Sequence, residues 1–155
     1  MMFNYKKYNY DLEHPLEGFL SENMLTDNIS GNFLLNNDIS PKKPLLFNGT
    51  KVNITLNNKT IKAPVFAESN GQILDGNTDS YALWVKDNAD LVIDGNGTVV
   101  SQSAKYSMAV WAQGGTVTIK GGKFFNNGEG SDLIYASAGG KVYIYGGEFH
   151  PCKKQ

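Results

Sequence analysis

GGTVTIKGGKF, residues 114–124, returns as GGKVYIYGGEF at residues 139–149. Every matched position, from the first Gly-Gly pair to the Phe, is offset by 25 residues. A fixed period of this size is typical of proteins built from stacked repeats, in which each repeat is one supersecondary unit. The repeat therefore predicts the architecture before any single residue is considered.

Two fainter copies lie upstream of this block. Residues 88–95 match residues 114–121 at an offset of 26, and one residue is regained at the next turn, so that Val99 precedes Phe124 by 25. Residues 53–61 form a fourth and more divergent copy. We expect about four repeats in all.

Each copy alternates with period 2 and is rich in β-branched and aromatic residues, which indicates strands rather than helices. Gly-Gly, Asn-Gly and Asn-Asn pairs bound these strands and permit tight corners. A turn of 25 residues with several short strands predicts an all-β fold, a short right-handed parallel β-helix. Equivalent residues of successive coils then stack about 4.8 Å apart. The alternative is an antiparallel β-sandwich with similar hairpins.

The register predicts which residues stack on one another. The expected inward ladders are Leu91/Val117/Val142, Ile93/Ile119/Ile144 and Val99/Phe124/Phe149, with Trp84/Val110/Tyr135 on a second strand. The expected outward ladders are Val92/Thr118/Tyr143 and Asp94/Lys120/Tyr145. The glycines expected at the corners are Gly114, Gly115, Gly121, Gly122, Gly139, Gly140, Gly146 and Gly147.

The composition narrows the expected partners. The chain has 155 residues and a net charge of −1, and all 14 of its basic residues are lysine, so we expect neither nucleic acid nor a membrane as a partner. Cys152 is the only cysteine, which excludes an intrachain disulfide. We find no signal-peptide core and no apolar run that could cross a bilayer, and therefore expect synthesis in the cytoplasm of a host cell.

We divide the chain at the stiff segment Pro41-Lys42-Lys43-Pro44. Residues 1–40, which lack the repeat, are expected to form an N-terminal anchoring arm with a short helix near residues 16–25. Residues 41–155 are expected to form the β-helix domain. The arm either contacts neighbouring proteins in an assembly or folds back on its own domain.

Residues 44–150 resemble the right-handed parallel β-helix, or pectin-lyase-like, superfamily. The Gly-Gly-x-Val-x-Ile-x-Gly-Gly-x-Phe unit, and residues 131–136 that lead into its second copy, are similar to short β-helix modules of tailed-bacteriophage virion proteins. This resemblance implies a structural virion protein, a capsid head fibre or decoration protein. A tail position is the next choice.

Many members of this superfamily cleave polysaccharides, but their catalytic residues do not carry over. The pectate-lyase branch uses an arginine base, and this chain has no arginine. The polygalacturonase-like branch has Asn-Thr-Asp, present as residues 77–79, but also an Asp-Asp pair and Gly-His-Gly, which are absent. We expect Asp94 beside Lys120 to be a solvated ion pair, and the Asp87/Asp90 turn offers too few oxygens for calcium. We predict no catalytic, metal or cofactor site.

The candidate interaction surface consists of Tyr143, Tyr145, Thr118 and Lys120. Exposed aromatic residues on a flat parallel face either stack on sugar rings or form a subunit interface, and the short stack favours the interface. Its open ends predict a homo-oligomer, a trimer or dimer. The other expected partners are virion proteins, through the arm, and host glycans. The alternatives are a polysaccharide-active enzyme and a carbohydrate-binding adhesin module.

Overall fold

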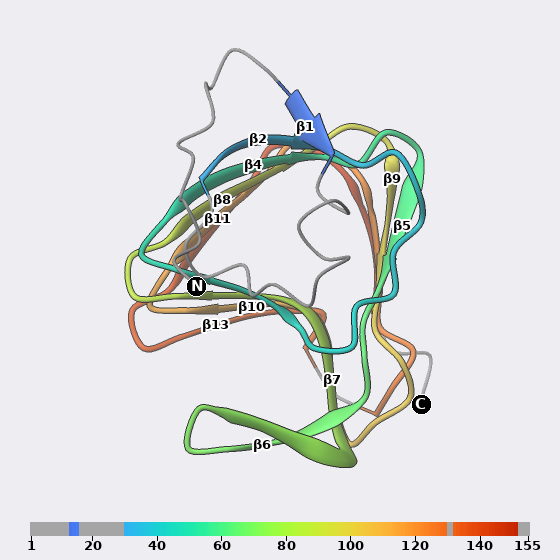
Figure 1. Ribbon diagram of the computed structural model, residues 1–155, viewed down its shortest axis with the longest axis vertical. Helices are drawn as coiled ribbons and strands as arrows, with labels where there is room; N and C mark the ends of the chain where they lie inside the picture. Colours follow the sequence, from blue (N-terminus) through green and yellow to red (C-terminus); the bar gives the residue numbers. More distant parts are fainter. Residues whose placement is uncertain (1–12, 16–29, 130–131, 152–155) are drawn as a thin grey trace, which may run out of the picture.

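The structure, a computed structural model, describes residues 13–15, 30–129 and 132–151. Within these ranges all regular secondary structure is β-strand, and the strands form three sheets. The three sheets lie as three sides around a common interior (Figure 1). The helix expected near residues 16–25 lies outside the described residues.

The first sheet has the strand order β1-β2-β4-β8-β11-β14. Its strands are β1 (Glu13–Pro15), β2 (Gly31–Leu34), β4 (Lys51–Thr55), β8 (Asp90–Asp94), β11 (Thr116–Ile119) and β14 (Lys141–Ile144). All neighbours in this sheet are parallel.

The second sheet has the order β13-β10-β7-β3, and the third has the order β15-β12-β9-β5. The second is made of β3 (Leu45–Asn48), β7 (Gln72–Lys86), β10 (Tyr106–Gln113) and β13 (Ile134–Ser137). The third is made of β5 (Lys59–Lys62), β9 (Gly97–Val100), β12 (Lys123–Phe125) and β15 (Glu148–His150). The strand β6 (Phe66–Ser69) pairs antiparallel with the first part of β7 and forms a hairpin at the side of the second sheet (Figure 1).

Consecutive strands visit the three sheets in a fixed order. The chain passes from β8 through β9 to β10, and the next three strands, β11, β12 and β13, repeat the same sequence of sheets. Each new strand then lies parallel to the strand that precedes it by one circuit. Parallel pairing of this kind excludes the antiparallel sandwich.

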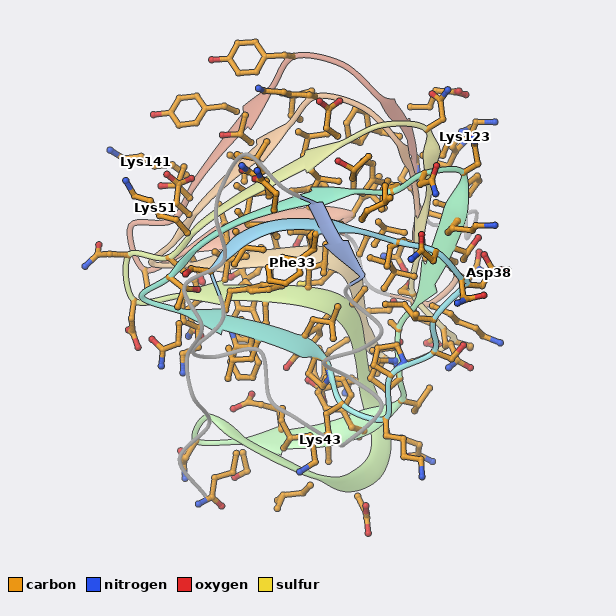
Figure 2. The ribbon with its side chains drawn as sticks, turned by 45° about the horizontal axis from the view of Figure 1, so that its top comes forward. Phe33, Asp38, Lys43, Lys51, Lys123 and Lys141 are labelled. Carbon is orange, nitrogen blue, oxygen red and sulfur yellow. The ribbon has the colours of Figure 1, made fainter. Side chains whose placement is uncertain are left out.

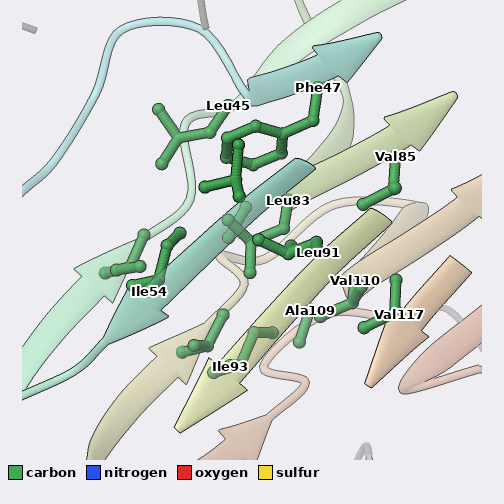
Figure 3. Close-up of a cluster of buried hydrophobic side chains, with 14 of the residues drawn as sticks. Leu45, Phe47, Ile54, Leu83, Val85, Leu91, Ile93, Ala109, Val110 and Val117 are labelled. Atoms are coloured by element: carbon green, nitrogen blue, oxygen red, sulfur yellow. The ribbon is translucent and has the colours of Figure 1, made fainter. Parts of the chain in front are cut away.

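The predicted inward ladders of the repeat are confirmed. Val117 pairs with Leu91 and Val142, Ile119 pairs with Ile93 and Ile144, and Phe124 pairs with Val99 and Phe149. Inner side chains of neighbouring strands, such as Ile54 and Ile93, point into the same interior (Figure 3). Because strands alternate their side chains, a single register error would turn this whole apolar set outward. The apolar set therefore determines the register.

The ladder expected on the second sheet is wrong by one residue. Val110 pairs with Leu83 and Ile134, while Trp111 pairs with Trp84 and Tyr135. The cause is a shorter corner. Gly114 and Gly115 alone separate β10 from β11, whereas three residues separate β7 from β8 and β13 from β14. An alignment of the repeats that is correct on β11 and β14 is therefore wrong by one residue on β10, the strand before the shorter corner.

The first sheet extends beyond the repeat that is visible in the sequence. β2 pairs with β4, and Phe33 (labelled in Figure 2) is fully buried in the main core. Leu35 is fully buried in the same core. Ile39 pairs with Ile61 and belongs to the same core. The expected boundary at residues 40/41 thus does not coincide with an edge of the sheet. The anchoring role of the arm stays a prediction.

The Gly-Gly pairs at the corners divide two tasks between their members. Gly114 and Gly139 both have φ of 79°, in the left-handed region that glycine adopts without strain. Their neighbours Gly115 and Gly140 allow close approach instead. A Cβ on Gly115 would lie 2.8 Å from the Val85 carbonyl oxygen of the adjoining strand. At these two corners one glycine makes the turn, and the other lets the corner lie against the end of the neighbouring strand.

A buried amide closes the corner that follows β12. Asn126 is 3% exposed, and its Oδ1 accepts hydrogen bonds from the Ser101 hydroxyl and the Gly128 amide, both at 2.9 Å. Its Nδ2 donates to the backbone carbonyls of Ser107 and Asp132. A buried polar side chain is tolerated when its donors and acceptors are paired. Asn126 thus joins the third sheet to the second.

We predict that Ile119→Asp lowers the free energy of unfolding by about 3 kcal/mol or more, since it buries an unpaired charge between two layers. Ile119 is fully buried, whereas its neighbour Thr118 faces outward and is only half-buried. The matched control is therefore Thr118→Asp, which we expect to change stability by less than about 1 kcal/mol. Thermal unfolding followed by circular dichroism makes the comparison. Cooperative melting of Ile119→Asp at the wild-type temperature would contradict the inward ladder.

Candidate functional site

The four residues of the candidate interaction surface lie together on the outer face of the first sheet. Tyr143 pairs with Thr118, and the Tyr145 amide donates a 2.8 Å hydrogen bond to the Ile119 carbonyl. The Lys120 side chain is exposed, and Tyr143 and Tyr145 are 46% and 75% exposed. These positions agree with the predicted outward ladders, and the role of the surface stays a prediction.

The same end of the molecule exposes residues of the inner ladders. Ile144 is 53% exposed, although its partners Ile119 and Ile93 are fully buried. Val142 and Phe149 are only partly buried, whereas their equivalents in the preceding layer are fully buried. β13, β14 and β15 each form the last strand of their sheet among the described residues. We call this set of three edge strands the C-terminal end face.

Aromatic rings also stack in register and end at this face. Phe124 and Phe149 stack at 5.3 Å, and Phe125 and His150 stack at 4.4 Å. The ring spacing is close to the distance between neighbouring strands. In the described part of the chain, Phe149 and His150 are the last rings of these stacks. The layer arrangement therefore ends with ring faces as well as apolar side chains.

A second aromatic cluster lies outside the main core, where the β6–β7 hairpin covers the second sheet. It consists of Phe66, Tyr81 and Trp84, with Trp111 packed against it. The two indoles stack at 4.9 Å with an interplanar angle of 4°. The Trp84 Nε1 donates to Gln113 Oε1 and the Trp111 Nε1 to Ser137 Oγ, both at 2.9 Å.

Sequence reasoning missed this cluster because of the one-residue register error. The expected inward ladder Trp84/Val110/Tyr135 left Trp111 one residue out of register with Trp84. Both in fact face outward from the second sheet, at paired positions. Trp84 stands two residues before the end of β7, and Trp111 stands two residues before the end of β10. Aligning the two strands at their last residues, rather than at the glycines of the corner, would have paired the two tryptophans.

The hairpin also contains one buried carboxyl group, that of Asp79 in the Asn77-Thr78-Asp79 segment, where Asp79 pairs with Phe66 of β6. Burial raises the pKa of Asp79 above its ordinary value of 3.8, and the nearby charge of Glu68 raises it further. The Thr78 hydroxyl donates a 2.7 Å hydrogen bond to Asp79 Oδ1, which opposes this shift. Next to it, burial raises the pKa of Tyr81 far above its ordinary value of 10.0. The Tyr81 hydroxyl is buried without a hydrogen-bond partner among the described residues.

The other candidate polar groups do not converge. Asp94 and Lys120 form no ion pair in the described structure, and Asp94 Oδ1 instead accepts a 2.7 Å hydrogen bond from the Gly95 amide. Asp87 is exposed at a corner with φ of 49°. Over residues 13–15, 30–129 and 132–151 no three His, Cys, Asp or Glu side chains gather as a metal site would require. The same ranges contain no helix that is long and apolar enough to span a membrane.

Comparison of this chain with protein-family models, with curated proteins and with solved structures finds no match.

We predict that Asp79→Asn raises the melting temperature at neutral pH. The folded-state pKa of Asp79 lies above the unfolded value, so the fold favours the protonated carboxyl, and this contribution to stability is lost as pH rises through the folded pKa. An amide removes that loss while it keeps the oxygen that accepts from Thr78. The advantage of the variant should shrink as pH falls towards 3.8.

The matched control for this measurement is Asp75→Asn, because Asp75 lies on the same strand with an exposed side chain. We expect its melting temperature to follow that of the wild type at every pH. An Asp79→Asn protein that is less stable than the wild type at neutral pH would show that the carboxylate is stabilising, contrary to this account.

Proposed function

We propose that the three parallel sheets are the faces of a short right-handed parallel β-helix, and that the chain is a structural rather than a catalytic protein. Two observations support the β-helix: the cyclic order in which strands visit the sheets, and the common register of the layers. The right hand follows from the strong preference of parallel crossover connections for that hand.

The observation that carries a structural role is the continuous inner ladder. Ile54, Ile93 and Ile119 are fully buried in consecutive layers, and each layer is paired on both sides by backbone hydrogen bonds. Such a stack can unravel only from its ends, because every interior strand has two parallel neighbours. It therefore suits a rigid projection or spacer that must resist proteolysis and shear.

We further propose that this rigid element belongs to the virion of a tailed bacteriophage, as a head fibre or decoration protein. Support comes from the resemblance of the repeat unit at residues 114–124 and 139–149, and of residues 131–136, to virion β-helix modules. In this role residues 1–40 contact other virion proteins through side chains other than the core residues Phe33, Leu35 and Ile39, while the layered part is displayed.

A second candidate function, binding of host glycans, uses the exposed tyrosines of the first sheet. Tyr143 and Tyr145 present aromatic surface beside the hydroxyl of Thr118 and the ammonium of Lys120. Aromatic rings next to hydrogen-bonding groups can hold sugar rings. The same residues also suit a contact between two protein copies, so the two functions compete for one surface.

The virion role is tested by mass spectrometry of phage particles purified from cells that encode the chain. We expect its peptides in the particles at a fixed ratio to the major capsid protein. Gold-labelled antibodies then place it on the head, which we expect, or on the tail. Particles that lack the chain, from cells that synthesise it, would overturn the proposal.

A further inference from the structure

We propose that the C-terminal end face binds the same face of a second copy of this chain, with twofold symmetry, so that β14 pairs antiparallel with β14 of the other copy. This inference rests on the stacked fold proposed above and does not depend on a virion location. The observation behind it is that the end face has the side chains of an interior layer, but no described layer covers it.

The side chains of the end face are those that every other layer buries. Ile144 and Val142 continue the ladders whose earlier members, Ile119 and Val117, are fully buried. An apolar set of this kind at the edge of three sheets attracts further strands unless charges or prolines blunt it. Pro151 follows β15, but β13 and β14 contain no proline and no inward-facing charge.

The backbone of β14 is arranged to accept another strand. The amides of Lys141 and Tyr145 donate to the Gly115 and Ile119 carbonyls of the preceding layer, at 3.0 and 2.8 Å. Because the direction of these groups alternates along a strand, the N–H and C=O groups of Val142 and Ile144 point away from that layer. Val142 and Ile144, on either side of Tyr143, therefore both offer a donor and an acceptor on the open side.

A twofold axis through Tyr143 satisfies these groups. It sets Val142 of one copy against Ile144 of the other as a hydrogen-bonded antiparallel pair, and the reverse pair forms on the other side of the axis. Both side chains then face the interior, so that the apolar ladder continues across the contact. The same rotation places β13 over β15 of the other copy, also antiparallel. All three open edges are thus covered by one isologous contact.

The outer face of this contact uses the exposed tyrosines. Tyr143 lies opposite Tyr143 of the other copy, and Lys141 lies opposite Tyr145 of the other copy. Cross-strand pairs of aromatic residues, and of a lysine with an aromatic ring, are favourable. This arrangement gives the strongly exposed Tyr145 a partner, and it favours the subunit-interface role of this surface over glycan binding.

Charge complementarity favours the same arrangement. Lys141 stands directly after the corner between β13 and β14, and Glu148 stands directly after the corner between β14 and β15. The twofold rotation superposes these two corners, so that Lys141 of one copy and Glu148 of the other carry opposite charges on the two sides of the same corner. Both side chains are exposed. Within one copy Glu148 lies 3.9 Å from Lys123 Nζ and 3.7 Å from His150 Nε2, and neither of these pairs includes Lys141.

The test is sedimentation of the purified full chain over a wide range of concentrations. We expect a dimer, and we expect Ile144→Lys to be a folded monomer, because Ile144 is half-exposed in the single copy but buried in the contact. Circular dichroism confirms the fold of each variant. Lys141→Glu should raise the dimer dissociation constant about tenfold or more, because it removes the contact of the lysine with Tyr145 and places like charges on the two sides of each superposed corner. The double variant Lys141→Glu/Glu148→Lys should bind more tightly than either single variant, and Glu148→Lys alone measures the loss of the pairs with Lys123 and His150.

The matched control is Lys51→Glu, because Lys51 occupies the position of Lys141 three strands away in the same sheet, and both lysines project from the same side of the molecule (Figure 2). We expect its dimer to be unchanged. A wild-type chain that stays monomeric, an open series of larger oligomers, or a dimer that Ile144→Lys leaves intact would each overturn the proposal. A double variant that binds no more tightly than the two single variants would overturn the twofold register. None of these results bears on the virion location, which the particle analysis tests separately.

Discussion

The fold depends on one constraint, which is that each parallel strand must present the same apolar side chains as the strand before it. Ile54, Ile93, Ile119 and Ile144 occupy one such line across four strands. Backbone hydrogen bonds hold neighbouring strands together, but they are equally compatible with other registers. The buried ladder selects the register, since a shift by one residue would expose the entire line.

The corners follow from this constraint. If the ladders are to stay aligned, each connection must return the chain to the same position, one strand spacing further on. Gly-Gly pairs do so by combining a left-handed turn with close contact between neighbouring corners. Where a corner is shorter, as at Gly114 and Gly115, the spacing between paired residues changes by one residue on the strand before that corner. The ladders therefore stay aligned although the repeat length varies.

Much of the layered core could be predicted from the sequence, because its signal is local. Residues 114–124 and 139–149 carry strand alternation, corner glycines and apolar positions in one register. Strands β1 and β2 could not be predicted in this way, since residues 1–40 do not carry a recognisable copy of the repeat. Insertion of the β6–β7 hairpin between β5 and β8 also hid the alignment of the early strands. The stacked indoles of Trp84 and Trp111 were missed for a related reason, the short corner.

The candidate surface was predicted more completely than the groups beneath the hairpin. Outward positions follow from strand parity, which places Tyr143 and Tyr145 correctly. The environment of Asp79 depends instead on the antiparallel β6–β7 hairpin. This hairpin is not part of the sequence repeat, so the repeat does not predict it. The C-terminal end face could be predicted only in part. Strand alternation predicts which of its side chains face inward, but only the strand order of the structure shows that no described strand covers them.

The most direct test of the parallel ladder is a nuclear Overhauser experiment on protein labelled at the isoleucine methyl groups. The account predicts cross-peaks between Ile54 and Ile93, between Ile93 and Ile119, and between Ile119 and Ile144. It predicts none between Ile54 and Ile119, which are two strand spacings, or about 10 Å, apart. A pattern that lacks the sequential contacts, or that joins Ile54 directly to Ile119, would contradict the stacked parallel arrangement.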